Sequence, residues 1–132
     1  MDDPTKQQLI ESALAARSSA YAPYSNFQVG AAVLAKDGTI TTGANVENAS
    51  YGLAICAERV ATATAIATGH RELLAVAIAS NGAATPCGAC RQFLAEFGSN
   101  MNVLLVDAEN RQHVKETTLA KLLPEQFKIK KK

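Results

Sequence analysis

The hydrophobic pattern of the first half of the chain predicts one helix followed by a strand hairpin. Apolar side chains recur at helical spacing over residues 3–19, where an Asp-Pro pair suits the start of a helix. The run 27–35 is almost wholly apolar, which is typical of a strand covered on both faces. Asp37-Gly38 favours a tight turn, so residues 39–46 should return as an antiparallel strand.

In the second half of the chain, strands and helices alternate. A loop leads to an alanine-rich helix at 56–68, which ends before Gly69. Its small side chains permit close approach either to another helix or subunit or to the sheet of its own chain. Further strands are expected at 73–80, 102–106 and 112–115, and further helices at 90–97 and 119–123. Such alternation implies an α/β fold with parallel pairing through right-handed crossovers.

Length and charge limit the classes of partner. A chain of 132 residues without repeats or linkers suits one domain, 1–132. A net charge of +1 gives no electrostatic basis for binding nucleic acid, and the lysines at the C-terminus suit a solvated tail. The apolar runs are too short to span a membrane, and the acidic start does not resemble a signal peptide. We therefore expect a cytoplasmic protein with neither membrane nor nucleic acid as partner.

All three cysteines fall in two short segments, as Cys56 and as the pair Cys87 and Cys90. An odd number of thiols in a reducing compartment favours metal binding over disulfides. Two cysteines at this spacing can bind one metal, and a third thiolate from elsewhere leaves one tetrahedral position open. The pattern is typical of a catalytic zinc site.

Two charged residues beside Cys56 suit such a site. Because Cys56 and Cys87 lie near helix starts, the helix dipoles favour their thiolates. Arg59 is placed to offset the charge of a zinc ion with three thiolates, so that a bound water can reach a pKa of roughly 7. Glu58 is not needed as a ligand, and a free carboxylate there can carry a proton from the water to a substrate nitrogen.

The chain resembles the zinc-dependent cytidine deaminases that act on free nucleosides, in the small, three-cysteine branch that is typically homotetrameric. Cys56-Ala57-Glu58 stands where the wider deaminase signature has H-x-E, and Pro86-Cys87 opens its P-C-x-x-C motif. The resemblance implies a three-layer α/β/α sandwich with a mixed five-stranded sheet. The segments of this chain that carry the resemblance are 21–25, 27–32, 43–49, 56–59, 86–92 and 122–124 with Phe127.

The resemblance implies a role for each matching residue. Cys56, Cys87 and Cys90 would bind one Zn²⁺ per chain, with Glu58 as proton shuttle. Phe27 would stack on the pyrimidine, Asn45 and Glu47 would bind the ribose hydroxyls, and the backbone of Ala57 and the Thr85 carbonyl would contact the polar edge of the base and the leaving ammonia. Phe127, Ala49 and Tyr51 would reach the site of a neighbouring subunit.

The implied reaction is hydrolytic deamination of cytidine and 2′-deoxycytidine to uridine and 2′-deoxyuridine, a step of pyrimidine salvage. A zinc-bound hydroxide would attack C4 while Glu58 protonates N3 and then the amino group, and ammonia would leave.

Other interpretations remain open from the residues alone. A structural zinc needs a fourth protein ligand, which His70 or His113 would have to supply. A Cys-x-x-Cys redox pair would leave Cys56 and Glu58 without a purpose. A zinc-stabilised binding module, or a deaminase for polynucleotides or a nucleoside antibiotic, would keep the metal and change the function. Without the family, Glu58 could be an ordinary acid of a first helical turn, and Phe27 a core residue.

Overall fold

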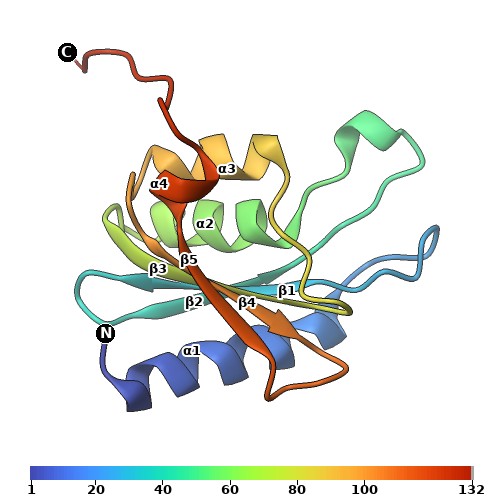
Figure 1. The fold of residues 1–132 in the computed structure, drawn as a ribbon. Helices are drawn as coiled ribbons and strands as arrows, with labels where there is room; N and C mark the ends of the chain where they lie inside the picture. The colour runs from blue at the N-terminus through green and yellow to red at the C-terminus, as the bar shows by residue number, and fades with distance from the viewer. Residues whose placement is uncertain (132) are drawn as a thin grey trace.

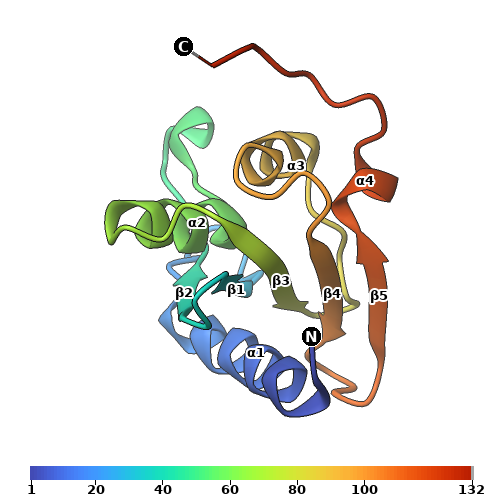
Figure 2. The same cartoon turned by 90° about the vertical axis from the view of Figure 1, so that its left-hand side faces the viewer.

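A mixed sheet with helices on both faces makes up the fold, which the computed structural model describes for residues 1–131 (Figure 1). Helix α1 (Asp3–Ala16) covers one face, and helices α2 (Ala57–Ala67) and α3 (Gly88–Ala95) lie side by side on the other (Figure 2). The expected three-layer sandwich is confirmed. The five strands, in the order β2-β1-β3-β4-β5, are β1 (Gly30–Ala35), β2 (Ile40–Ala44), β3 (Leu73–Ser80), β4 (Asn102–Asp107) and β5 (Val114–Thr118).

The predicted hairpin forms between β1 and β2, which pair antiparallel. Gly38 has a φ of 93° in the turn, a conformation that glycine adopts without a steric penalty. All six residues of β1 are buried, as the apolar run predicted. The strand is shorter than expected, however, because residues 27–29 precede it as an extended segment without ladder partners.

The crossover prediction holds only in part. β3 and β4 pair parallel, with α3 between them in the chain, whereas β3 pairs antiparallel with β1. The reason is that β1 lies between β2 and β3 in the sheet. β2 and β3 therefore run in the same direction, and α2 connects two parallel strands that are not neighbours.

The last strand and helix also differ in their bounds from the expectation. β5 occupies Val114–Thr118 and not 112–115, and it pairs antiparallel with β4 as the edge strand of the sheet. It ends where the Thr118 hydroxyl accepts a hydrogen bond from the Lys121 N–H and so caps the short helix α4 (Leu119–Leu122).

Helix α1 packs through the apolar stripe that predicted it. Leu9, Ile10, Ala13 and Leu14 are buried against the sheet. The N-cap is Asp2 and not Asp3, since the Asp2 carboxylate accepts the Thr5 N–H at 2.8 Å. Residues Arg17–Ser19 continue the helix as a 3₁₀ turn, so the predicted end near residue 19 is confirmed.

Helix α2 uses its small residues against its own sheet. Ala57, Ala61 and Ala65 are fully buried in the cluster that also contains the side chains of β1 and β3 on that face. Strand β2 meets the helix at Gly43, where a β-carbon would lie 2.4 Å from the Ala61 nitrogen. Ala57, Ala61 and Ala65 therefore take the role of packing against the sheet of the same chain, whereas Ala63 and Ala67 are exposed. None of the helices over residues 1–131 has the length and apolarity needed to cross a bilayer.

The contact at Gly43 gives a first prediction. Gly43→Ala should lower the free energy of unfolding by roughly 1–3 kcal/mol, because the new methyl group meets helix backbone that cannot move aside cheaply. Urea denaturation followed by circular dichroism measures the change. Gly52→Ala is the matched control: a β-carbon there meets nothing within 4 Å, so we expect a change below about 1 kcal/mol. Equal stability of the two variants would contradict this account of the packing.

Candidate active site

Two helix starts bring the three cysteines together. Cys56 is the N-cap residue of α2 and Cys87 that of α3, while Cys90 lies in the first turn of α3. Their three sulfur atoms lie within 4.8 Å of one another, and the Cys87 and Cys90 sulfurs are 3.4 Å apart. Cys56 thus forms one cluster with Cys87, 31 positions later in the sequence, and with Cys90, as the zinc hypothesis requires.

The cluster fits a zinc ion with one open position. Tetrahedral Zn–S bonds of about 2.3 Å place sulfurs about 3.8 Å apart, close to the spacing observed. The Arg59 Nε is buried and has no hydrogen-bond partner among residues 1–131. A zinc ion with three thiolates carries a net negative charge, and such a charge nearby would stabilise this guanidinium.

The protonation of the thiols is consistent with metal binding. A hydrogen bond with the Cys90 thiol, with a smaller contribution from Arg59, lowers the pKa of Cys56 to about 5 against the effect of burial. The same hydrogen bond, with burial and the nearby Glu58, raises the pKa of Cys90. Cys56 is therefore the thiol of the cluster that loses its proton more readily than Cys90.

Arg59 is held beside these thiols by the backbone. Its Nη2 donates to the Ala54 carbonyl oxygen at 3.3 Å, just before the helix begins. Contact with the Cys56 thiol raises the pKa of Arg59, with a smaller opposite effect of burial. The structure therefore places Arg59 where the sequence predicted a compensating charge.

Glu58 lies in the first turn of α2 and is only 5% exposed. Burial raises the pKa of its carboxyl, and the charge of Cys56 acts in the same direction. A carboxyl group with a raised pKa can both accept and release a proton near neutral pH. The geometry suits a proton carrier and does not suit a solvated surface acid.

Most of the predicted site residues line one cavity of about 220 Å³. It lies at the carboxyl end of β3 and the starts of α2 and α3, where ligands commonly bind in α/β folds. The predicted residues in its lining are Phe27, Asn45, Cys56, Ala57, Glu58, Thr85 and Cys87. The sequence missed Val29, Ile78, Ser80 and Ala84. Ser80 could have been found, because it is a polar residue that ends an apolar strand at this edge.

Glu47 and Tyr51 line a neighbouring hollow of about 280 Å³, together with Tyr24 and Ser25. Glu47 binds the loop before β1: its Oε1 accepts the Tyr24 N–H at 2.9 Å, and its Oε2 accepts the Ser25 hydroxyl. The Ser25 hydrogen bond is the main reason why the pKa of Glu47 is lowered. Glu47 therefore stays ionised beside the cavity.

Two of the predicted substrate-binding residues lie outside both hollows. Phe127 follows α4 in the C-terminal segment, where its ring is 70% exposed and its carbonyl oxygen accepts the Gln92 Nε2 at 3.3 Å. Ala49 is exposed in the loop before the 3₁₀ turn η2 (Tyr51–Leu53).

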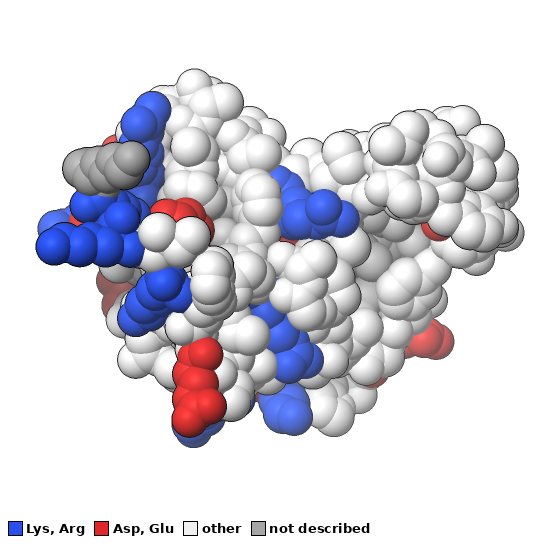
Figure 3. All heavy atoms as spheres, turned by 90° about the horizontal axis from the view of Figure 1, so that it is seen from above, with Lys and Arg blue, Asp and Glu red and all other residues white. Residues whose placement is uncertain are grey.

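Seen from the side of α2 and α3, basic side chains gather on one side of the molecule, and the lobe on the other side is largely uncharged (Figure 3).

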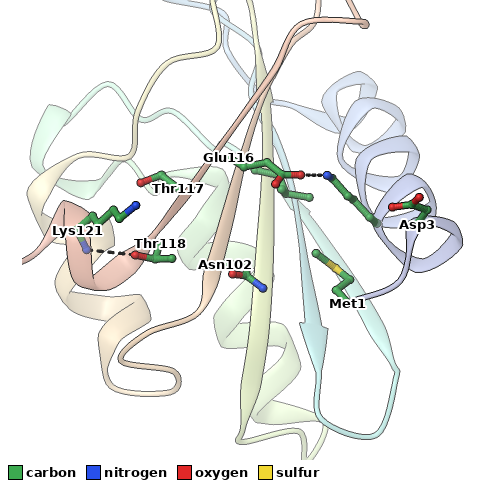
Figure 4. A pocket seen from close by; sticks show the side chains of 9 residues that line it. Met1, Asp3, Asn102, Glu116, Thr117, Thr118 and Lys121 are labelled. Atoms are coloured by element: carbon green, nitrogen blue, oxygen red, sulfur yellow. Dashed lines mark hydrogen bonds and ion pairs between the residues drawn. The ribbon is translucent and has the colours of Figure 1, made fainter.

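The opposite end of the sheet holds a different hollow, of about 280 Å³, between α1, the start of β4 and the end of β5 (Figure 4). Lys6 forms an ion pair with Glu116 there, and Thr118 caps α4. No cysteine or histidine lines it. It is separate from the thiol cluster and we assign it no part in the chemistry.

The histidines do not complete a structural zinc site. Within residues 1–131, the only cluster of metal-ligating side chains contains the three cysteines alone. His70 pairs with Asp37 at 3.3 Å, and the backbone of His113 bonds to Asp107 and Asn110. A redox pair would also leave unexplained why Cys56 lies in the cluster.

Arg59 provides a second prediction. Arg59→Gln should weaken zinc binding by about tenfold, since it removes the charge that stabilises the three thiolates. Competition between the protein and a chromogenic chelator measures the zinc affinity directly. Arg71→Gln, at an exposed position before β3, is the control and should leave the affinity unchanged. An unaltered affinity in Arg59→Gln would refute the compensating role.

Comparisons with known proteins agree with this site. Residues 3–106 match the family model described as the cytidine and deoxycytidylate deaminase zinc-binding region. A cytidine deaminase of Halalkalibacterium halodurans is 46% identical over 125 residues, which cover 92% of this chain and 93% of that protein.

Solved structures agree as well. The crystal structure of cytidine deaminase from Burkholderia pseudomallei has a TM-score of 0.87 at 46% identity and covers 96% of this chain and 100% of that one. The one from Mycobacterium tuberculosis has a TM-score of 0.81 at 39% identity, with 98% and 100% covered. The expected enzyme class, the fold and the zinc cofactor are thereby confirmed. This chain belongs to the family of zinc-dependent cytidine and deoxycytidylate deaminases.

Proposed function

We propose that this chain hydrolyses free cytidine and 2′-deoxycytidine to uridine and 2′-deoxyuridine with release of ammonia, as a step of pyrimidine salvage. The observation that carries the proposal is the buried Glu58, which lies on the wall of one cavity with the thiols of Cys56 and Cys87. The relatives named cytidine deaminase support the choice of substrate. We also propose that residues 1–132 act as one domain in the cytoplasm.

The lining of the cavity suits a pyrimidine nucleoside. Phe27, 41% exposed, presents its ring for stacking on the base, and the Thr85 carbonyl and Ala57 backbone supply polar groups for its edge. Asn45 and Glu47 are assigned to the ribose hydroxyls. A polynucleotide substrate is less well supported, because a net charge of +1 gives little overall electrostatic attraction to a phosphate backbone.

The proposed mechanism uses Glu58 twice. Zinc held by the three thiolates would supply the Lewis acidity that lowers the pKa of water to roughly 7. Glu58 would accept a proton from the attacking water and give it to N3, which would make C4 electrophilic as the water oxygen bonds to C4. Glu58 then carries the second proton to the amino group, the C4–N bond breaks, and ammonia leaves.

Glu58→Gln tests this role. The amide keeps the size of the side chain and cannot carry protons, so kcat should fall by about a hundredfold to ten-thousandfold while zinc remains bound. The decrease of cytidine absorbance gives the rate, and metal analysis gives the zinc content. Glu11→Gln, on the exposed face of α1, should keep wild-type turnover. Full turnover by Glu58→Gln, or no turnover by zinc-loaded wild type, would refute the mechanism.

We further propose a homotetramer whose sites are shared between subunits. Phe127 is too exposed to serve the fold of its own chain, and Tyr51, 83% exposed, projects from η2 with Leu53 beside it. Exposed aromatic and aliphatic side chains of this size mark an interaction surface. Phe127, Ala49 and Tyr51 are assigned to the site of a neighbouring chain.

Mixed tetramers test the sharing of sites. Phe127→Ala should raise KM by roughly tenfold through loss of stacking, and Glu58→Gln removes the proton carrier. When the two variants are coexpressed with different tags, some sites take Glu58 from a Phe127→Ala chain and Phe127 from a neighbouring Glu58→Gln chain. These sites have both residues. Random assortment should then restore about a quarter of wild-type activity at low cytidine concentration. An active monomer in sedimentation, or no recovery in purified mixed tetramers, would contradict shared sites.

A further inference from the structure

Phe27 lies in a segment without regular secondary structure, between the 3₁₀ turn Arg17–Ser19 and β1. Both of its backbone polar groups are bound by side chains. The Phe27 N–H donates to the Ser25 Oγ at 3.0 Å, and its carbonyl oxygen accepts the Asn45 Nδ2 at 2.8 Å. Asn26, between Ser25 and Phe27, has a φ of 57°, in the left-handed region. Side chains, and not a sheet ladder, therefore hold the backbone of Phe27.

Asn45 holds the segment on the other side as well. Its Oδ1 accepts the Val29 N–H at 2.9 Å, so one amide group binds the residues on both sides of Gln28. The backbone of Asn45 adds a hydrogen bond from its N–H to the Val29 carbonyl oxygen at 3.2 Å. Asn45, which is assigned to the ribose, thus also helps to hold Phe27, which is assigned to the base.

Ser25 links this support to Glu47. Its hydroxyl donates to the Glu47 carboxylate and accepts from Phe27, and Glu47 also accepts the N–H groups of Tyr24, at 2.9 Å, and Ser25, at 3.2 Å. A hydroxyl that accepts one bond and donates another is fixed in rotation. Glu47 therefore acts on Phe27 through a single bridging atom, the Ser25 oxygen.

These hydrogen bonds leave room for a sugar. An amide side chain has two donor hydrogens and two lone pairs, and Asn45 uses one of each. A carboxylate has about four acceptor positions, and Glu47 uses three. Both residues can bind a hydroxyl without releasing the loop.

We propose that Ser25 is a positioning residue, which with Asn45 and Glu47 fixes the Phe27 ring against the pyrimidine, so that base binding depends on these side chains even where the sugar offers them no hydroxyl. This inference rests on the proposed function. It departs from a purely sugar-binding role for Asn45 and Glu47, and it assigns Ser25 a role that sequence analysis did not.

The test uses Ser25→Ala with two substrates, cytidine and 2′,3′-dideoxycytidine, which lacks the 2′ and 3′ hydroxyls of the sugar. Loss of the bridging hydrogen bonds should raise KM by between about threefold and tenfold for both substrates, with kcat nearly unchanged. Ser25→Thr keeps the hydroxyl and should restore KM. In a Phe27→Ala background, Ser25→Ala should add little, because its effect passes through the missing ring.

Ser18→Ala is the matched control, since its exposed hydroxyl bonds only to the Ala15 carbonyl oxygen. An unchanged KM for dideoxycytidine in Ser25→Ala would overturn the proposal, as would full additivity with Phe27→Ala or a change confined to the melting temperature. If the wild type turns over neither substrate, the proposed function fails. In that case, the affinities of the wild type and Ser25→Ala for uridine and 2′,3′-dideoxyuridine, measured by calorimetry, decide the role of Ser25.

Discussion

The site depends on the meeting of two helix starts at one edge of the sheet. Three thiols that would repel one another as thiolates lie within 4.8 Å only because α2 and α3 begin at the same place. The partial positive charge of both helix starts and the guanidinium of Arg59 favour negative charge there, and a metal supplies the rest. The same first turn of α2 carries Glu58 into the interior, so Glu58 and Cys56 share one rigid support.

That meeting requires α2 to lie unusually close to the sheet. The absence of a side chain at Gly43 and the small side chains of Ala57 and Ala61 allow it. A larger residue would displace the helix, and with it Cys56, relative to the Cys87 and Cys90 pair, which belongs to another helix. The spacing of the three cysteine sulfurs therefore depends on the same contacts that pack α2 in the core. An error of 1 Å in this packing would pass directly into the spacing of the sulfurs.

The elements and the chemistry of the cluster could be predicted from the sequence, because each depends on local signals. The turn at Gly38, the capping positions of Cys56 and Cys87 and the charge of Arg59 are examples. The antiparallel pairing of β1 with β3 could not be predicted, since the periodicity of a strand does not name its neighbours. For the same reason the sequence did not reveal Ser25 as a bridge, because Glu47, which accepts its hydroxyl, lies in a loop 22 residues away.

The two parts of the site are built in opposite ways, and this has a consequence for binding. Glu58 is fixed by burial in a helix, whereas Phe27 is fixed by hydrogen bonds at an exposed loop. Under the proposed function, a hydroxyl that binds Glu47 or Asn45 also stiffens the support of Phe27, so less conformational entropy is lost when the base stacks. Coupling of this kind is reciprocal: a stacked base favours sugar binding by the same free energy. Nucleosides would then bind more tightly than the separate affinities of base and sugar suggest, without any contact between those two parts of the protein beyond the Ser25 oxygen and the Asn45 amide.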